Sequence, residues 1–338
     1  MVVFVNCGFC FIIERDRKQL GKAEIWRSAF SPFATAKCNE TWEVNDTKME
    51  KIVEVGVAVR NLESTSKKYV DILGATPSEI IPVDQYGNLC QMCRMVDVDL
   101  RLMEPTVDND TAKLIEKRRG DWLSYIGFRV PDIDGAIAWL KQNNVKMIDE
   151  TPRVEDGVKF AFVHPDSFRG MLFKLIEGEH KQRYLPEPPA HKAIPAPARV
   201  KRLYHIGVNV TDLDAATQLY TEVLGTRPSA VQTVEMYDMK CTMNRIGDVE
   251  FELLGATRED GVIGKSIARV GEGIVHLAFL VPDIEATIAW LMKSEIRMID
   301  ETPKEPGIEP FLEAFTHPAG FNGIMYEFIQ GEHHLFEQ

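Results

Sequence analysis

The chain contains one sequence pattern twice, and this repeat constrains its fold more than any other feature. VEVGVAVRNLESTSKKYVDILGATPS in the first half aligns with YHIGVNVTDLDAATQLYTEVLGTRPS, which lies 151 residues later. A second pair of segments aligns at the same offset, YIGFRVPDIDGAIAWLKQNNVKMIDETP with HLAFLVPDIEATIAWLMKSEIRMIDETP. Internal repeats indicate duplicated supersecondary units. We therefore expect two homologous halves of similar fold.

The length of 338 residues allows two domains that each have a proper core. The repeat assigns residues 50–180 to the first half and residues 201–332 to the second. Residues 181–200 are rich in proline, which predicts a semi-rigid, extended linker between the halves. Residues 1–48 have no counterpart in the second half, and we assign this N-terminal extension no function.

Each half alternates apolar strand-like runs with amphipathic helical runs. In the second half the sequence predicts one helix from Leu213 to Leu224, capped by Thr211 or Asp212 and ended by Gly225. The other predicted elements are a helix over 284–293 and strands over 205–210, 240–246, 249–254, 275–281, 314–317 and 324–329. This order gives two βαβββ units per half and four per chain, an α+β fold.

Four strand positions differ in chemical type between the two halves. The first half carries Glu54, Arg101, Tyr125 and Lys174. The second half carries His205, Glu252, His276 and Glu327. Because side chains alternate between the faces of a strand, four strands can aim one polar residue each into a common concave interior. Two imidazoles and two carboxylates suit one divalent metal ion, such as Mn, Fe, Co, Ni or Zn.

Histidines on apolar strands are often satisfied core residues, and this alternative must be weighed. Buried carboxylates without partners are costly, however, so Glu252 and Glu327 favour a metal. In the first half we hypothesise that Arg101 and Lys174 replace the ion's positive charge by pairing with Glu54. His317 has a counterpart in the metal-free half, which predicts a role in a strand-end turn rather than in chemistry.

The segments HIGVNVTDLDAATQLYTEVLG, GDVEFELLGA, HLAFLVPDIEATIAWL and HPAGFNGIMYEFI resemble the vicinal oxygen chelate superfamily of glyoxalases and extradiol dioxygenases. Locally they are similar to methylmalonyl-CoA epimerases. The resemblance implies βαβββ units paired into two cupped mixed sheets, with a divalent metal held at the four second-half positions. The epimerases place an acidic base shortly before the third strand. Here the aligned residue is Met236, with Glu235 beside it, so that base is absent or shifted by one.

The resemblance implies a divalent-metal-dependent epimerase, isomerase or lyase that acts through a metal-chelated enolate on a small oxo-acid or acyl thioester. We expect Glu327 and Glu235 to move the proton. Tyr237 and Lys240 are expected to orient the substrate.

Two other functions remain open. An Fe(II) extradiol-type ring-cleaving dioxygenase would use two histidines and one glutamate, and Glu252 as a fourth ligand counts against it. The chain also lacks the Y-x-x-D-P-x-G pattern before the last ligand that this group carries. A ligand-sequestering protein of the resistance type is the third candidate, although such proteins often lack metal ligands.

Composition limits the partners. A net charge of −12 argues against nucleic acid, because binding phosphates requires a basic face. The apolar N-terminal run is too short to span a bilayer, and its charges follow it, unlike those of a signal peptide. We expect a cytoplasmic protein with a small-molecule substrate and no membrane partner. Whether two chains form a homodimer stays open.

Overall fold

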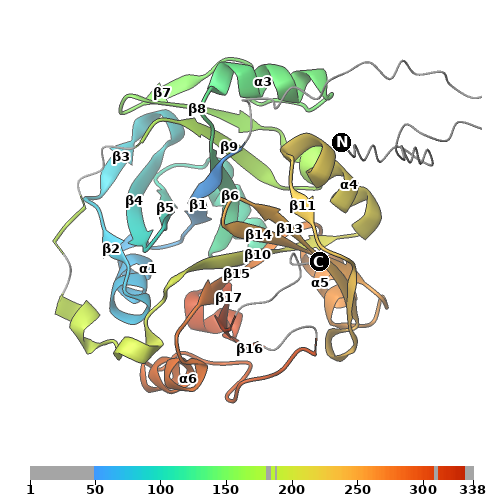
Figure 1. The fold of residues 1–338 in the computed structure, drawn as a ribbon. Coiled ribbons are helices and arrows are strands. Elements are labelled where there is room, and N and C mark those ends of the chain that lie inside the picture. Colours follow the sequence, from blue (N-terminus) through green and yellow to red (C-terminus); the bar gives the residue numbers. More distant parts are fainter. Residues whose placement is uncertain (1–48, 180–183, 187–188, 308–310, 332–338) are drawn as a thin grey trace, which may run out of the picture. The chain divides into compact units, whose positions relative to one another are not determined.

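The structure is a computed structural model that describes residues 49–179, 184–186, 189–307 and 311–331 (Figure 1). The predicted N-terminal extension, 1–48, lies outside the described residues. No helix in the described ranges is long and apolar enough to cross a membrane.

Both halves have the expected α+β architecture. The first half contains β1 (Lys51–Ala58), α1 (Leu62–Lys68), β2 (Thr76–Pro77), β3 (Ile81–Val83), β4 (Asn88–Met95), β5 (Val98–Pro105), α2 (Asp110–Arg118), β6 (Trp122–Arg129), α3 (Ile133–Gln142), β7 (Arg153–Glu155), β8 (Val158–Val163) and β9 (Leu172–Glu177). The second half contains β10 (Arg202–Val210), α4 (Leu213–Leu224), β11 (Arg227–Pro228), β12 (Gln232–Val234), β13 (Met239–Ile246), β14 (Val249–Ala256), α5 (Val262–Val270), β15 (Gly273–Leu280), α6 (Ile284–Lys293), β16 (Leu312–Phe315) and β17 (Met325–Gln330).

Each half forms one mixed sheet, and the two sheets have equivalent strand orders. The first sheet runs β2-β4-β5-β1-β6-β9-β8-β7, with β3 on β4. The second runs β11-β13-β14-β10-β15-β17-β16, with β12 on β13. At the centre of the second sheet, β10 pairs in parallel with β14 and antiparallel with β15, and β15 pairs in parallel with β17. The four strands that carry the predicted ligands are therefore consecutive.

Helices α4 and α6 have the bounds that the sequence predicts, and side-chain caps explain where they begin. Asp212 accepts a hydrogen bond from the backbone N–H of Ala215 at 3.0 Å, and Asp283 accepts one from Ala286 at 2.9 Å. Gly225 ends α4 with φ of 70°, a left-handed conformation that favours glycine. Helices α2 and α5 were not predicted. They follow β5 and β14, the third long strand of each half, and α5 borders the site described below.

The proline-rich linker is not simply extended, which corrects the expectation. Residues 189–193 and 196–198 form 3₁₀ turns, since proline is well accommodated in the first turn of a helix. Ile194 is buried, and the His191 ring nitrogen Nε2 lies 2.9 Å from the Ala75 carbonyl oxygen. This part of the linker is therefore packed against the first half.

The halves contact each other reciprocally. The indole N–H of Trp139 on α3 donates to the Val223 carbonyl at 3.1 Å, and that of Trp290 on α6 donates to the Ile72 carbonyl at 2.9 Å. Each residue in one bond has its repeat equivalent in the other. Aromatic contacts between the halves are reciprocal in the same way. Tyr69 packs on Phe321 and Tyr326, and the equivalent Tyr220 packs on Phe168 and Phe173. These contacts join the two halves through one continuous apolar core.

Candidate metal centre

The strand register places the four polar side chains of the second half in two adjacent rows across the sheet. In one row Gly207 of β10 lies between Glu252 of β14 and His276 of β15. In the next row Ala278 of β15 lies between His205 of β10 and Glu327 of β17. Small residues thus alternate with large ones, which gives the large side chains room to converge.

Gly207 is required by this packing. A Cβ atom at this position would lie 2.0 Å from Cε1 of the His276 imidazole, which no other residue can accommodate without displacing that ring. The equivalent Gly56 has the same relation to Tyr125, where a Cβ would lie 2.1 Å from the ring. The glycine of the HIGVNV motif therefore belongs to the site, since it makes room for the side chain on the neighbouring strand.

The four side chains meet in a compact, buried cluster. Each offers one ligand atom, and these atoms all lie within 4.8 Å of one another. His205 Nε2 is 3.1 Å from His276 Nε2 and 2.9 Å from Glu327 Oε2. Glu252 Oε2 lies 3.4 Å from His205 Nε2 and 3.5 Å from His276 Nε2.

These distances fit a divalent ion. Ligand atoms at about 2.0–2.2 Å from a shared ion are separated from their neighbours by roughly 2.8–3.6 Å, and the contacts above fall within that range. Two imidazole nitrogens and two carboxylates are also a donor set suited to Mn, Fe, Co, Ni or Zn. The second half therefore has a histidine–glutamate cluster that could hold a divalent metal.

The same proximity shifts the proton affinities of the cluster. Burial disfavours the charged imidazolium of His276, but hydrogen bonds to Glu252 and Glu327 outweigh it and raise the pKa of His276 to about 9. Burial likewise disfavours the Glu327 carboxylate, yet the two histidines lower its pKa to about 2. His276 therefore tends to retain a proton in the metal-free cluster. A bound cation would take over the proton's role of reducing the repulsion between Glu252 and Glu327.

A cavity of about 570 Å³ opens onto this cluster. Glu252, His276 and Glu327 line its inner end. Its walls are largely apolar and are formed by Met236, Met239, Leu254, Ile263, Phe315 and Met325. Three basic side chains also line it, Lys265 and Arg269 of α5 and Lys304. Of these, Lys304 pairs with Asp300. Lys265 and Arg269 are exposed.

Glu313 is a cavity residue that the sequence analysis missed. Its carboxylate accepts a 2.5 Å hydrogen bond from the Tyr237 hydroxyl, and both residues line the cavity. Burial and the charge of Glu327 raise the pKa of Glu313 to about 9. Glu313 lies on the short strand β16, and its partner is 76 residues away in sequence. Glu313 pairs with Ile329 of β17, two residues along that strand from Glu327. This proximity depends on strand pairing and has no local sequence signal.

Two of the four predicted catalytic residues line the cavity, and two do not. Glu327 and Tyr237 line the cavity. Glu235 and Lys240 are exposed and are not among the residues that line it, so their placement does not support the expected roles. Met236, which the sequence comparison aligns with the base expected of an epimerase, does line the cavity. His317 caps a 3₁₀ turn by accepting from the backbone N–H of Ala319, and His164 does the same in the first half, as predicted.

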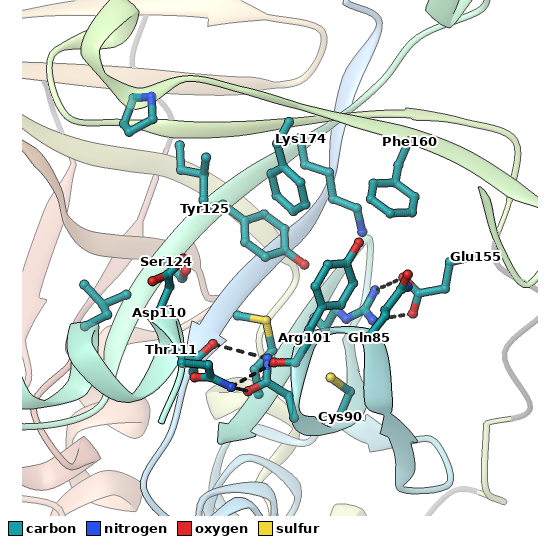
Figure 2. Close-up of a pocket in the computed structure, with 18 of the residues that line it drawn as sticks. Gln85, Cys90, Arg101, Asp110, Thr111, Ser124, Tyr125, Glu155, Phe160 and Lys174 are labelled. Carbon is teal, nitrogen blue, oxygen red and sulfur yellow. Dashed lines mark hydrogen bonds and ion pairs between the residues drawn. The ribbon is translucent and has the colours of Figure 1, made fainter. Parts of the chain in front are cut away.

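The first half has an ion-paired cluster at the equivalent positions. Lys174 Nζ lies 2.7 Å from Glu54 Oε1, as the hypothesis required, and the Tyr125 hydroxyl donates to the same oxygen at 2.5 Å. Arg101 forms its ion pair with Glu155 of β7 instead, which corrects the expected pairing with Glu54 (Figure 2). Lys174 and Tyr125 both donate hydrogen bonds to Oε1 of Glu54. Glu155 accepts hydrogen bonds from the Arg101 guanidinium through both of its carboxylate oxygens.

Comparisons with known proteins agree with this architecture. The profile of the glyoxalase/bleomycin resistance protein/dioxygenase superfamily matches residues 54–162 and 204–315. Mitochondrial methylmalonyl-CoA epimerase from Mus musculus is 25% identical over 130 residues, which is 38% of this chain and 73% of the relative. The enzyme of that name from Dictyostelium discoideum is 28% identical over 129 residues, 38% of this chain and 78% of the relative.

One solved structure resembles both halves together. A mutant of 4-hydroxymandelate synthase from Streptomyces coelicolor superposes with a TM-score of 0.67 and 19% identity, covering 85% of this chain and 94% of that protein. At this identity the likeness concerns the fold alone. It matches the tandem arrangement of two curled mixed sheets that the sequence predicted.

Proposed function

The chain belongs to the glyoxalase/bleomycin resistance protein/dioxygenase superfamily, and from this membership we propose that it is a divalent-metal-dependent enzyme. Its second half would bind one ion through the four clustered side chains. The convergence of two histidines and two glutamates within 4.8 Å carries the proposal. Without an ion the cluster would bury two carboxylates close together, which is costly.

We further propose an epimerase, isomerase or lyase reaction on a small oxo-acid or acyl thioester. When bound, the ion would act as a Lewis acid that polarises the substrate oxygens and favours enolate formation. The apolar cavity walls would exclude water and so strengthen the interactions of charged groups within it. Lys265 and Arg269 at the cavity would attract the negative charge of an acid or of a nucleotide-bearing thioester.

The chain's own carboxyl groups can move the proton. Epimerisation requires removal of a proton from one face of a carbon and delivery to the other. Glu313 and Glu327 supply two carboxyl groups on the cavity wall, and Tyr237 orients the Glu313 carboxylate through its hydrogen bond. We therefore assign to Glu313 the role that the sequence analysis gave to Glu235.

The presence of Glu252 in the cluster supports this reaction class over ring cleavage. Ring-cleaving dioxygenases of this superfamily were expected to use two histidines and one glutamate. A fourth protein ligand leaves fewer positions on an octahedral ion, so substrate and O₂ could not readily bind together. Two adjacent positions suffice for the two oxygens of a chelating acid or thioester.

Metal content tests the proposal first. Elemental analysis of the purified protein should find one divalent ion per chain, and Glu252→Ala and His276→Phe should lose it. Tyr125→Phe is the matched control, since it places the same residue at the equivalent position of the first half and should retain the metal. A wild-type protein without a stoichiometric divalent ion would contradict the proposal.

Solvent exchange tests the reaction. Methylmalonyl-CoA, the substrate in the relatives' names, and simpler oxo-acids should acquire deuterium from D₂O at the carbon next to the carbonyl. Glu313→Gln should slow this exchange while leaving the metal bound. Oxygen uptake with catechols would instead favour the dioxygenase. Bound metal and tight ligand binding without turnover would favour a sequestering protein.

A further inference from the structure

The first half has a cavity of its own that the proposed function does not use. Its volume is about 550 Å³, close to that of the metal cavity and within the range of roughly 300–1,000 Å³ typical of small-molecule sites. Figure 2 shows Tyr125, Lys174, Phe160 and Arg101 around it, contributed by four different strands.

The inner end of this cavity is charged but balanced. Lys174 and Arg101 are 1% and 4% exposed, and their partners Glu54 and Glu155 also have nearly buried side chains. Two positive and two negative charges therefore cancel. A buried ion pair often contributes less stability than apolar residues of the same volume. This arrangement is thus better explained by recognition of a ligand than by folding stability.

The charged groups retain hydrogen-bond donors. An ammonium group has three N–H donors, and among the described residues Lys174 Nζ makes one hydrogen bond, to Glu54 Oε1. The Arg101 guanidinium has five N–H donors and directs two hydrogen bonds to Glu155. The inner end of the cavity can therefore donate to an oxygen acceptor of a ligand.

One side of the remaining wall is aromatic and aliphatic, and the rest of the lining includes the polar side chains of Gln85, Asn88, Asn109, Asp110, Thr111 and Ser124. Phe162 packs edge-on against both Tyr125 and Phe160, with ring centroids 5.4 and 5.9 Å apart, and Tyr86 and Leu172 complete this side. Flat rings prefer such edge-to-face surroundings. A charged ligand would disturb the balance of the buried ion pairs, whereas a neutral one would not.

We propose that the first half contains a second, metal-independent ligand site, which binds a neutral aromatic molecule whose carbonyl or amide oxygen accepts a hydrogen bond from Lys174. The aromatic ring lies among the phenylalanines and tyrosines of the wall. This site does not depend on the metal centre or on its reaction.

Three probes of the same shape and different charge test the proposal. Benzamide, benzoate and benzylamine are titrated against the full-length protein in excess chelator, and ligand-observed NMR follows binding into the millimolar range. Benzamide should bind saturably at one site per chain and more tightly than the two charged probes. Absence of saturable benzamide binding would overturn the proposal. Tighter binding of benzoate or benzylamine would overturn the assignment to a neutral ligand.

The repeat supplies a matched pair of variants that locate the site. Ser124 and Val275 are equivalent positions on β6 and β15, and each lines its own cavity. Ser124→Trp should abolish benzamide binding and leave metal content unchanged, whereas Val275→Trp should retain benzamide binding. The reverse pattern would place the probe in the metal cavity and refute the inference.

A second variant tests the contact to Lys174 without leaving a buried charge unpaired. Lys174→Met combined with Glu54→Gln replaces the ion pair by neutral side chains of similar size. Benzamide should then bind about tenfold more weakly, as expected for loss of a hydrogen bond from a charged donor. Unchanged affinity in a variant that melts like the wild type would exclude Lys174 as the donor.

Discussion

The two cavities differ in what balances two buried negative charges. In the first half Glu54 and Glu155 are neutralised by Lys174 and Arg101. In the second half Glu252 and Glu327 converge on His205 and His276, and among the described residues no Lys or Arg forms an ion pair with either carboxylate. A divalent ion would make the second cluster neutral as well. The comparison teaches that one strand framework can carry either two buried ion pairs or a histidine–glutamate cluster, which we propose is completed by one metal ion.

Exchanging the four residues gives the largest expected effect. Glu54→His, Arg101→Glu, Tyr125→His and Lys174→Glu together reproduce the second-half donor set on equivalent strands. Because Gly56 and Gly127 occupy the same rows as Gly207 and Ala278, we expect these side chains to converge. Elemental analysis should find two ions per chain instead of one. A folded variant that still binds one ion would show that these four residues on the equivalent strands are not sufficient to form a metal centre.

Breaking the first-half pair is expected to be costly. Lys174→Met removes the buried cation that contacts the Glu54 carboxylate and should lower the free energy of unfolding by about 3–5 kcal/mol. Chemical denaturation measures this loss. The double variant with Glu54→Gln should recover most of it, and both variants should keep their metal. Equal losses in the single and double variants would contradict the charge-balance interpretation.

The second half should respond to pH in a way that the first half does not. With its pKa raised to about 9, His276 stabilises the metal-free protein below its unfolded pKa of about 6.5, and this contribution is lost as pH rises through 9. An ion must displace that proton, so metal affinity should rise by about tenfold per pH unit from 6.5 toward 9. Calorimetric titration of metal into chelator-treated protein measures the slope. Affinity that is flat or falls over this range would contradict the assignment.

The smallest expected effect is at the contact between the halves. Trp139→Phe and Trp290→Phe each remove one hydrogen bond to a carbonyl of the other half and should each cost about 1 kcal/mol. Denaturation curves of the two variants should nearly coincide. A clear difference between them would show that the halves are not equivalent at this contact.

The sequence predicted the features that depend on local pattern or on the repeat. The bounds of α4 and α6, the strands of the second half and the four clustered residues all follow from periodicity, caps and the comparison of equivalent positions. The pairing of Lys174 with Glu54 was predicted for the same reason.

The missed features depend on contacts between distant segments. Arg101 meets Glu155 because the short strand β7 reaches it, and Glu313 meets Tyr237 across 76 residues. No local signal marks either pair. Glu235 and Lys240 lie near the expected base in sequence, but both are exposed and neither is among the residues that line the cavity.

The reciprocal tryptophan contacts have a consequence for how the two halves can change. Two identical chains that pair around such contacts are encoded by one gene, so a substitution in one cavity must occur in the other as well. Joining the partners in one polypeptide removes that constraint while keeping the contact that both need. Either cavity can then change its residues independently of the other, and deleting one half would expose the apolar face that the other half packs against.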